Sequence, residues 1–387
     1  MEARQAKGAK ARGRRNGDLQ KAVRRPDNDF HQIPAQSARF PANPWYAPAD
    51  PAKLVTVRYR EEEMRWALQT IPLSAVNFEC ILSFVQSCLA KLGLQHYSHA
   101  ASLWVFFAAW GLTELFVSFL ICTPLERFWP LTSWPKRNSI AADVSYAIFV
   151  RVVLFPLIAY FEYDWLRQNL DAFLGSHAVA PPSLSGLIPM LAAWPAVVSI
   201  ANFAILDLAD YWRHRLSHRY GWWYGIHSLH HAEEQMTFWS DDRSHVLEDA
   251  ITYAWLITVG LIVGVPAMQF PFLILCMRFL GSVAHANTRV NYGWLGGNIF
   301  ISPQFHRTHH ALRAAGRRSC NFGTALPWWD ILFGTARFRD CTVETGDAGA
   351  EPDLVNGSWG EQQRAGFRRM VRLARRGRKT PAVRTAS

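Results

Sequence analysis

Charged residues are scarce in the middle of this sequence and gather at its two ends. They make up 18% of the 387 residues, against 50% hydrophobic and 13% aromatic. Met1–Phe30 carries nine Lys or Arg against four acids, and Glu361–Ser387 carries nine against one. A long, apolar and weakly charged middle argues against a water-soluble protein and indicates a membrane protein. We expect the basic ends to bind anionic lipid headgroups and not nucleic acid, since no aromatic-basic module accompanies the charge.

Cysteine is equally sparse. The six cysteines are scattered without a Cys-x-x-Cys pair, which argues against a disulfide framework and a thiolate zinc site. The polar start of the chain lacks the apolar stretch of a secretory signal peptide. Proline and charge over residues 1–65 predict a basic, disordered tail and linker. We expect residues 341–387 to form a second basic tail, dispensable for folding.

Long apolar segments are present, and they predict an all-α, polytopic membrane protein. A segment that is mostly apolar but interrupted by polar residues, Ile71–Leu94 within residues 66–100, is either a weak span or an amphipathic interfacial helix. Two shorter runs around Gly264-Val265-Pro266 predict a hairpin that enters the membrane and returns. The expected spans are Ser102–Cys122, Ala141–Phe161 and Leu187–Leu208, and the hairpin arms are Ile251–Val265 and Phe270–Ala284.

The loops between these spans predict their orientation. Arg127, Lys136 and Arg137 make the loop after the first long span basic, so we expect it to be cytoplasmic. The loop Glu162–Ser185 is acidic and should face outward. Following the chain from there places its histidine-rich segments in a helical cap on the cytoplasmic side. Glu114, inside the first long span, is expected to be paired or functional.

Histidine is the residue that the middle of the chain has in excess. Ten of its 14 histidines lie between His214 and His310. His-x-x-His-His occurs at 227–231 and again at 306–310, and His214 and His218 lie four residues apart. Such positions share a helix face, and neutral imidazoles that converge there bind iron, zinc, copper or nickel. The pattern predicts one metal centre, and the number of histidines favours two ions.

These histidine boxes resemble those of a known family. "DLADYWRHRLSHRYGWWYGIHSLHH", "RSHVLE", "AHAN", "SPQFHRTHH" and "NFGTALPWWDILFGT" are similar to the motifs of the fatty acid hydroxylase/sterol desaturase superfamily, whose members are membrane-bound histidine-box di-iron enzymes. The resemblance covers about Ser102 to Arg339 and predicts a catalytic domain over 101–340. The sequence departs from the pattern at Val246, where the family has proline, and after His285, which Arg289 follows instead of a second histidine.

The resemblance implies an oxidoreductase with two iron ions, O2 as co-substrate, a membrane lipid as substrate and an external electron donor of the ferredoxin or cytochrome b5 type. Asp207, Glu248 and Asn321 would support the ligands, and His245 and Asn287 are further candidate ligands. The implied metal ligands are His214, His218, His227, His230, His231, His285, His306, His309 and His310. We expect a lipid hydroxylase. The alternatives are a desaturase using the same centre and a membrane protein that binds or transports metal without catalysis.

Overall fold

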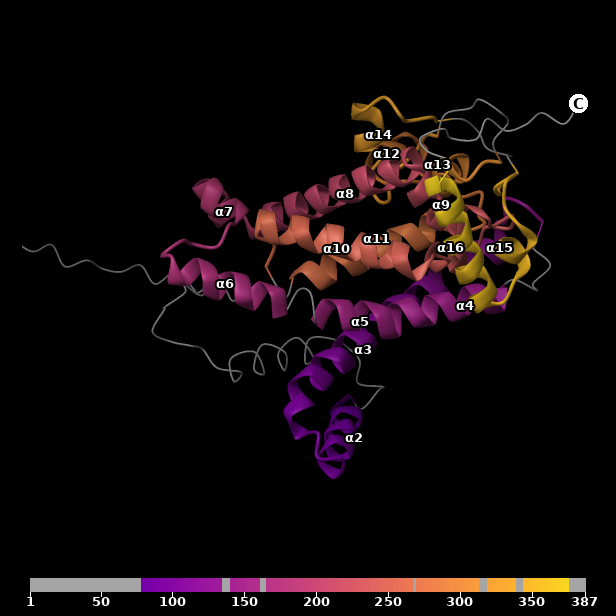
Figure 1. Ribbon diagram of the computed structural model, residues 1–387. Coiled ribbons are helices and arrows are strands. Elements are labelled where there is room, and N and C mark those ends of the chain that lie inside the picture. Colours follow the sequence, from indigo (N-terminus) through magenta and orange to yellow (C-terminus); the bar gives the residue numbers. More distant parts are fainter. Residues whose placement is uncertain are drawn as a thin grey trace, which may run out of the picture. The chain divides into compact units, whose positions relative to one another are not determined.

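The computed structural model describes residues 78–133, 140–160, 165–266, 269–312, 319–338 and 344–375, and these fold into helices joined by loops (Figure 1). The all-α prediction is confirmed; the described residues add an isolated antiparallel bridge between Ala311 and Thr345. The first helices are α2 (Phe78–Lys91), η1 (Gln95–Tyr97), α3 (Ser98–Phe128), α4 (Ile140–Ile148), η2 (Phe149–Leu154), α5 (Phe155–Ile158), α6 (Leu166–Ser176), α7 (Leu184–Leu187) and η4 (Pro189–Ala193). They are followed by α8 (Pro195–Arg219), α9 (Gly221–His231), η5 (Phe238–Asp242), α10 (Val246–Val263), α11 (Gln269–His285), α12 (Gly293–Ile299), α13 (Pro303–His309), α14 (Trp328–Leu332), α15 (Pro352–Asn356) and α16 (Trp359–Arg375).

Three helical segments of the described chain are long and apolar enough to cross a membrane: Gln95–Phe128, Ile140–Ile158 and Val246–Val263. The first two confirm the spans predicted at Ser102–Cys122 and Ala141–Phe161, although residues 161–164 lie outside the described chain. The third contains most of the first arm of the predicted hairpin, Ile251–Val265, and ends two residues before the arm does.

The span predicted at Leu187–Leu208 is wrong in its bounds. Pro189 and Pro195 each begin a new helical segment, because proline fits the first turn of a helix and not its interior. The helix that follows, α8, runs on through charged residues as far as Arg219. It therefore carries the first two histidines of the boxes out of the apolar part of the chain.

The predicted hairpin forms through α10 and α11, which lie side by side in Figure 1. Gly264 ends α10 in the left-handed conformation, with φ of 77°. A side chain there would also collide with the carbonyl oxygen of Pro182, 1.6 Å from the Cβ position. Glycine is required at this turn for both reasons.

The helix α2 has 14 residues, which gives a length of about 21 Å, less than the roughly 30 Å of a bilayer core. Residues 1–77 lie outside the described chain, and with them the predicted tail over 1–65 and the start of the 66–100 helix. The interpretation of Ile71–Leu94 as a weak span or an interfacial helix stays a prediction.

The apolar core lies between α3, the 140–158 segment, α8, α10 and α11. Phe107, Phe155, Leu206, Ile257 and Phe270 are among its buried side chains. The helix α10 runs antiparallel to α8 and α11, so the start of α10 meets the ends of the other two at one end of the bundle (Figure 1). All the histidine boxes lie at this end, which confirms that the tertiary fold brings them together.

The prediction that residues 341–387 form a tail is wrong for the described part, because α16 packs closely on α9. A Cβ atom on Gly225 of α9 would lie 2.4 Å from the Cα atom of Met370. Ala365 and Leu373 are buried in this contact, while Arg368 and Arg372 point outward. The segment was predicted to be a tail because it is basic, but α16 is an amphipathic helix that covers the histidine box on α9.

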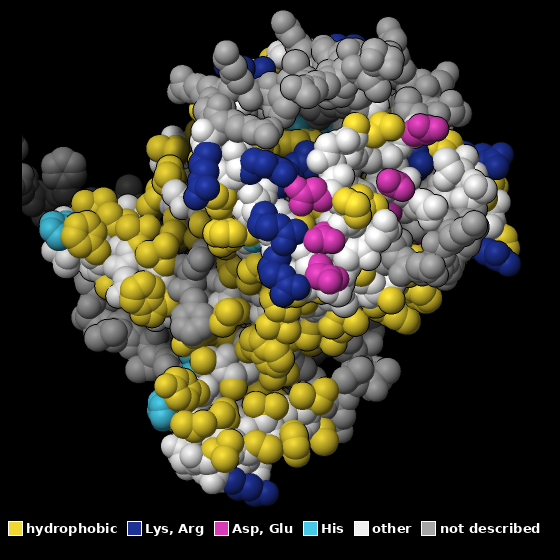
Figure 2. Space-filling view, turned by 45° about the vertical axis from the view of Figure 1, so that its right-hand side comes forward, with side chains coloured by type: hydrophobic (Ala, Val, Ile, Leu, Met, Phe, Trp, Pro, Cys, Tyr) yellow, Lys and Arg dark blue, Asp and Glu magenta, His cyan; other side chains and the backbone are white. Residues whose placement is uncertain are grey.

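Charged and hydrophobic side chains separate on the surface. Arg, Lys, Asp and Glu gather near the centre of the face in Figure 2, with hydrophobic side chains below and to the left. Many large hydrophobic side chains of α3 are exposed, among them Leu112, Phe116, Phe119 and Leu120. An exposed apolar surface of this kind is typical of a helix that faces lipid.

Candidate metal centre

The structure brings all nine predicted ligand histidines into two groups, within which the candidate ligand atoms lie no more than 4.8 Å apart. They come from α8, α9, α11 and α13, with His310 at the C-cap of α13, and they are buried with the exception of His218 and His230. The five-histidine group comprises His214, His218, His227, His231 and His309, and the four-histidine group comprises His230, His285, His306 and His310.

Each His-x-x-His-His box divides between the two groups. In the first box, His227 and His231 belong to the five-histidine group and His230 belongs to the four-histidine group. In the second box, His306 and His310 belong to the four-histidine group and His309 belongs to the five-histidine group. Side chains four residues apart, such as the first and last histidines of a box, point in directions about 40° apart around a helix. The adjacent second and third histidines point about 100° apart. One short helix can therefore supply ligands to two neighbouring ions.

The spacing between the nitrogens fits metal coordination. In the five-histidine group, Nε2 of His231 lies 3.1 Å from Nε2 of His218 and 3.0 Å from Nε2 of His309. In the other group, Nε2 of His285 lies 3.2 Å from that of His230 and 3.1 Å from that of His306. Ligands about 2.0–2.1 Å from an ion lie about 2.9–3.4 Å apart at adjacent positions of an octahedron or tetrahedron.

Backbone carbonyls fix the proton on the outer nitrogen of three rings. The Nδ1 atoms of His214, His285 and His309 donate to the carbonyl oxygens of Phe322 (2.8 Å), Gly281 (2.8 Å) and Cys320 (2.7 Å). Because a carbonyl can only accept, Nε2 of each ring carries a lone pair that points into its group. The Nε2 atom of His214 is buried without a hydrogen-bond partner. Such lone pairs repel one another unless a cation lies between them, so the donor set fits a pair of metal ions.

Burial favours the neutral form of five of the nine imidazoles. It lowers the pKa of His214 and His231 well below the usual range, and the neighbouring histidines lower it further. The pKa values of His230, His306 and His310 are shifted in the same direction for the same two reasons. The neutral form is the one that binds a transition metal.

A carboxylate supports one ring of each group. Glu248 Oε1 lies 3.3 Å from Nδ1 of His227, and it accepts a 2.8 Å bond from Arg213. This is the position expected for Glu248. On the other side, Asp241 Oδ1 lies 3.2 Å from Nδ1 of His285. Burial would raise the pKa of Asp241, but His285 and two arginines outweigh it and hold the pKa below the usual range.

Asp207 and Asn321 do not bond the histidines directly; they bond the backbone near them. Asp207, expected to accept from an imidazole, instead accepts from the backbone N–H groups of Ala325 (2.9 Å) and Leu326 (3.1 Å) and from the indole of Trp329 (2.9 Å). Asn321, with a positive φ of 57°, donates to the carbonyl of Phe305 (2.8 Å). Both residues hold the loop whose carbonyls, at Cys320 and Phe322, accept from histidines.

His245 and Asn287, the further candidate ligands, lie outside both groups. His245 is the N-cap of α10: its Nδ1 accepts from the N–H of Leu247 (3.1 Å), and its Nε2 lies 3.0 Å from the carbonyl oxygen of Gln363. Asn287 bonds the backbone and hydroxyl of Thr132 at 3.1 and 3.0 Å. These partners occupy the polar atoms that a metal would need.

Asp241 and Arg151 were not found by reasoning from the sequence. Arg151 lies in the predicted span Ala141–Phe161, and an arginine within a span is itself a signal of a functional or paired site. The structure places it beside Glu114, whose predicted pairing is confirmed, and beside Asp241 and Asp242. No spacing rule connects residues so far apart along the chain.

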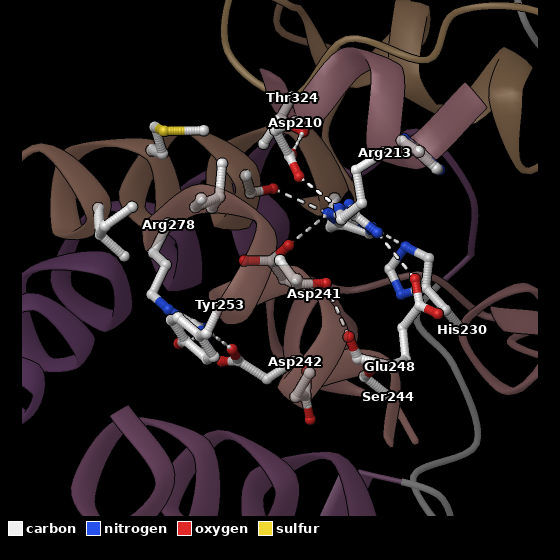
Figure 3. Close-up of a pocket in the computed structure, with 18 of the residues that line it drawn as sticks. Asp210, Arg213, His230, Asp241, Asp242, Ser244, Glu248, Tyr253, Arg278 and Thr324 are labelled. Carbon is white, nitrogen blue, oxygen red and sulfur yellow. Dashed lines mark hydrogen bonds and ion pairs between the residues drawn. The ribbon is translucent and has the colours of Figure 1, made fainter. Parts of the chain in front are cut away.

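A cavity of about 150 Å³ opens beside both groups of histidines (Figure 3). Five ligand candidates line it: His214, His227, His230, His285 and His306. Leu256, Ile274 and Met277 form apolar parts of the wall, and Arg278 lies beside Asp242 and the ring of Tyr253. A reacting group could therefore approach both metal positions from one side.

Comparison with known proteins agrees with this geometry. Residues 199–335 match the fatty acid hydroxylase family, and they include all nine histidines. The histidine-bearing part of the chain belongs to the fatty acid hydroxylase family. The predicted resemblance is thereby confirmed, as is the prediction of a membrane-bound oxidoreductase.

Relatives in this family carry different activities in their names. A very-long-chain aldehyde decarbonylase of Oryza sativa subsp. indica is 26% identical over 210 residues, which is 52% of this chain and 72% of the relative. A methylsterol monooxygenase of Arabidopsis thaliana is 28% identical over 178 residues, 43% of this chain and 63% of the relative. An alkylglycerol monooxygenase of Caenorhabditis elegans is 28% identical over 136 residues, 33% of this chain and 25% of the relative. No solved structure gives a significant match.

Proposed function

We propose that this fatty acid hydroxylase family member is an O2-dependent di-iron lipid hydroxylase. The observation that carries the proposal is the pair of histidine groups, with nitrogens at coordination spacing, on the wall of one cavity. Iron would be held by the nine histidines, and it would supply the activation of O2 that breaks an unactivated C–H bond. The names of the two monooxygenase relatives support this reaction class.

The reaction balances as R–H + O2 + two electrons + two protons giving R–OH + H2O. One oxygen atom enters the product and the other leaves as water. The chain's own contribution is to fix the imidazoles through backbone carbonyls and carboxylates and to hold the reacting carbon in the cavity. Desaturation uses the same reactants and removes two hydrogens, so the mass of the product distinguishes the two outcomes.

The cavity limits what part of the substrate is enclosed. A volume of about 150 Å³ is that of a cavity which holds benzene, so it takes a segment of a lipid and not a whole molecule. The remainder of the chain would lie along the exposed apolar helices in the membrane. The two electrons would come from an external protein of the ferredoxin or cytochrome b5 type.

The metal content tests this proposal directly. We expect the purified protein to hold about two iron ions per chain, because the nine imidazoles form two groups, each with enough ligands for one ion. Elemental analysis of the O2-consuming protein measures this. Stoichiometric zinc without iron in that active sample would contradict the di-iron assignment. Zinc in an inactive sample would not, because zinc binds such sites more tightly than iron(II).

We further propose that the histidine groups and α16 lie on the cytoplasmic side, as the basic loop after α3 indicates. Arg368→Cys on α16 should react with an impermeant thiol reagent only after the cells are permeabilised. Ser176→Cys on α6, which lies in the loop predicted to face outward, should react in intact cells. The unsubstituted protein gives the background from native cysteines, and the opposite pattern of labelling would reverse the topology.

A further inference from the structure

Arg151 is an arginine within a candidate membrane span, yet its side chain is only 1% exposed. It lies in the π-helical turn η2 and contacts three other elements. It pairs with Glu114 of α3, donates a 2.7 Å bond to Asp242 of η5 and another 2.7 Å bond to Ser282 of α11. Gly111 of α3 permits this approach, because a Cβ atom there would lie 2.3 Å from the carbonyl oxygen of Arg151. A buried arginine is expensive unless it is fully paired, and this one is.

From Arg151 a chain of contacts leads to a ligand histidine. Ser282 Oγ donates to Asp241 Oδ2 (3.1 Å), which also lies 3.5 Å from the Arg151 guanidinium. The other oxygen of Asp241, Oδ1, faces Nδ1 of His285 (3.2 Å). Asp241 is thus held by its far oxygen while its near oxygen lies against the imidazole.

The five-histidine group has the same order of groups. There Arg213 bonds Glu248 at 2.8 Å, and the same carboxylate oxygen lies 3.3 Å from Nδ1 of His227. An arginine, a carboxylate and an imidazole therefore follow one another at each metal position. Arg213 belongs to the region that matches the family, whereas Arg151 lies outside it.

We propose that Arg151 and Ser282 are positioning residues for the four-histidine group, acting through Asp241 on His285. They fix the carboxylate so that its charge orients the ring and makes Nε2 a stronger ligand. The inference rests on the proposed metal centre. It assigns to the membrane span 140–158 a role in holding metal as well as in crossing the bilayer.

Two buried serines provide a matched test, because both are 0% exposed and both donate to a carboxylate of this network. Ser282→Ala removes the hydroxyl that bridges Arg151 and Asp241 and leaves only their 3.5 Å ion pair. Ser118→Ala removes a bond to Glu114, which is connected to Asp241 through Arg151. The probe is iron(II) loaded into the full-length protein, followed by elemental analysis, Mössbauer spectroscopy and the rate of iron release to a chelator. We expect one of the two irons in Ser282→Ala to be released about tenfold faster, with one altered Mössbauer signal, and Ser118→Ala to match the wild type.

Arg151→Lys is the second variant. It keeps a positive charge among the carboxylates but loses the planar fork that bonds several partners at once, so it should weaken the same iron. If both variants retain and release iron like Ser118→Ala, the positioning role is overturned while the metal centre stands. A wild-type protein that binds no iron overturns the centre and this inference together. Thermal unfolding of each variant in detergent shows whether a loss of iron follows from a loss of fold.

Discussion

His309→Ala should lower turnover by more than about a hundredfold, since changing even an indirect partner of a metal ligand costs 10- to 100-fold. Nε2 of His309 lies 3.0 Å from that of His231, and its Nδ1 is fixed by the carbonyl of Cys320. Removing the ring opens a coordination position in the five-histidine group. Substrate turnover and iron per chain, measured on the same sample, check this result. His230→Ala should produce the corresponding loss in the four-histidine group.

His177→Ala is the matched control. This exposed residue caps α6, and among the described residues its ring bonds local atoms, the carbonyl of Phe173 (2.9 Å) and the hydroxyl of Ser176 (3.0 Å). It should leave turnover and iron unchanged, as should changes at His96 and His99, which lie before and at the start of α3. Full activity in His309→Ala, or complete loss in a folded His177→Ala protein, would show that the metal centre is misplaced.

Arg243→Met should lower the free energy of unfolding by about 3–5 kcal/mol, because it leaves buried charges without their partner. The Arg243 side chain is 1% exposed. It pairs with Glu233 (2.6 Å) and Asp143 (3.3 Å) and donates to the carbonyls of Leu354 (3.0 Å) and Val355 (2.6 Å). The residue thus joins α4, α15 and the loop that follows α9. Equilibrium unfolding in detergent micelles measures the change.

Arg368→Met removes the same kind of side chain from the surface. Arg368 is 53% exposed and pairs with Asp353 at 3.0 Å, so its loss should cost only about 0–1 kcal/mol. Equal stability of the two variants would mean that the buried network contributes no more than an ordinary surface pair.

The C-terminal segment shows where reasoning from composition fails. Its excess of arginine suggested a solvated tail, but burial depends on which residues share a face. Ala365, Arg369 and Leu373 recur at intervals of four and turn toward the protein. Arg369 is itself buried, with its guanidinium over the ring of Tyr224 and 2.7 Å from Asp347. The net charge of a segment does not show whether its buried residues share one helix face. The four-residue spacing of these side chains would have predicted a packed helix.

The sequence by itself determined the helical class, two of the membrane spans and the identity of the nine convergent histidines. Those properties are local: the length of an apolar run and the spacing of residues on one helix face can be read without a partner. Tertiary structure alone decided how the histidines divide into groups of five and four, and which side chains stand behind them. His230 and His231 are adjacent in the chain yet serve different groups, because neighbours on a helix point about 100° apart and the packing of α11 and α13 determines what each one meets. Arg151 reaches Asp241 and Ser282 only because α11 and η5 fold against its span, and contacts between residues so far apart in the chain are set by the fold.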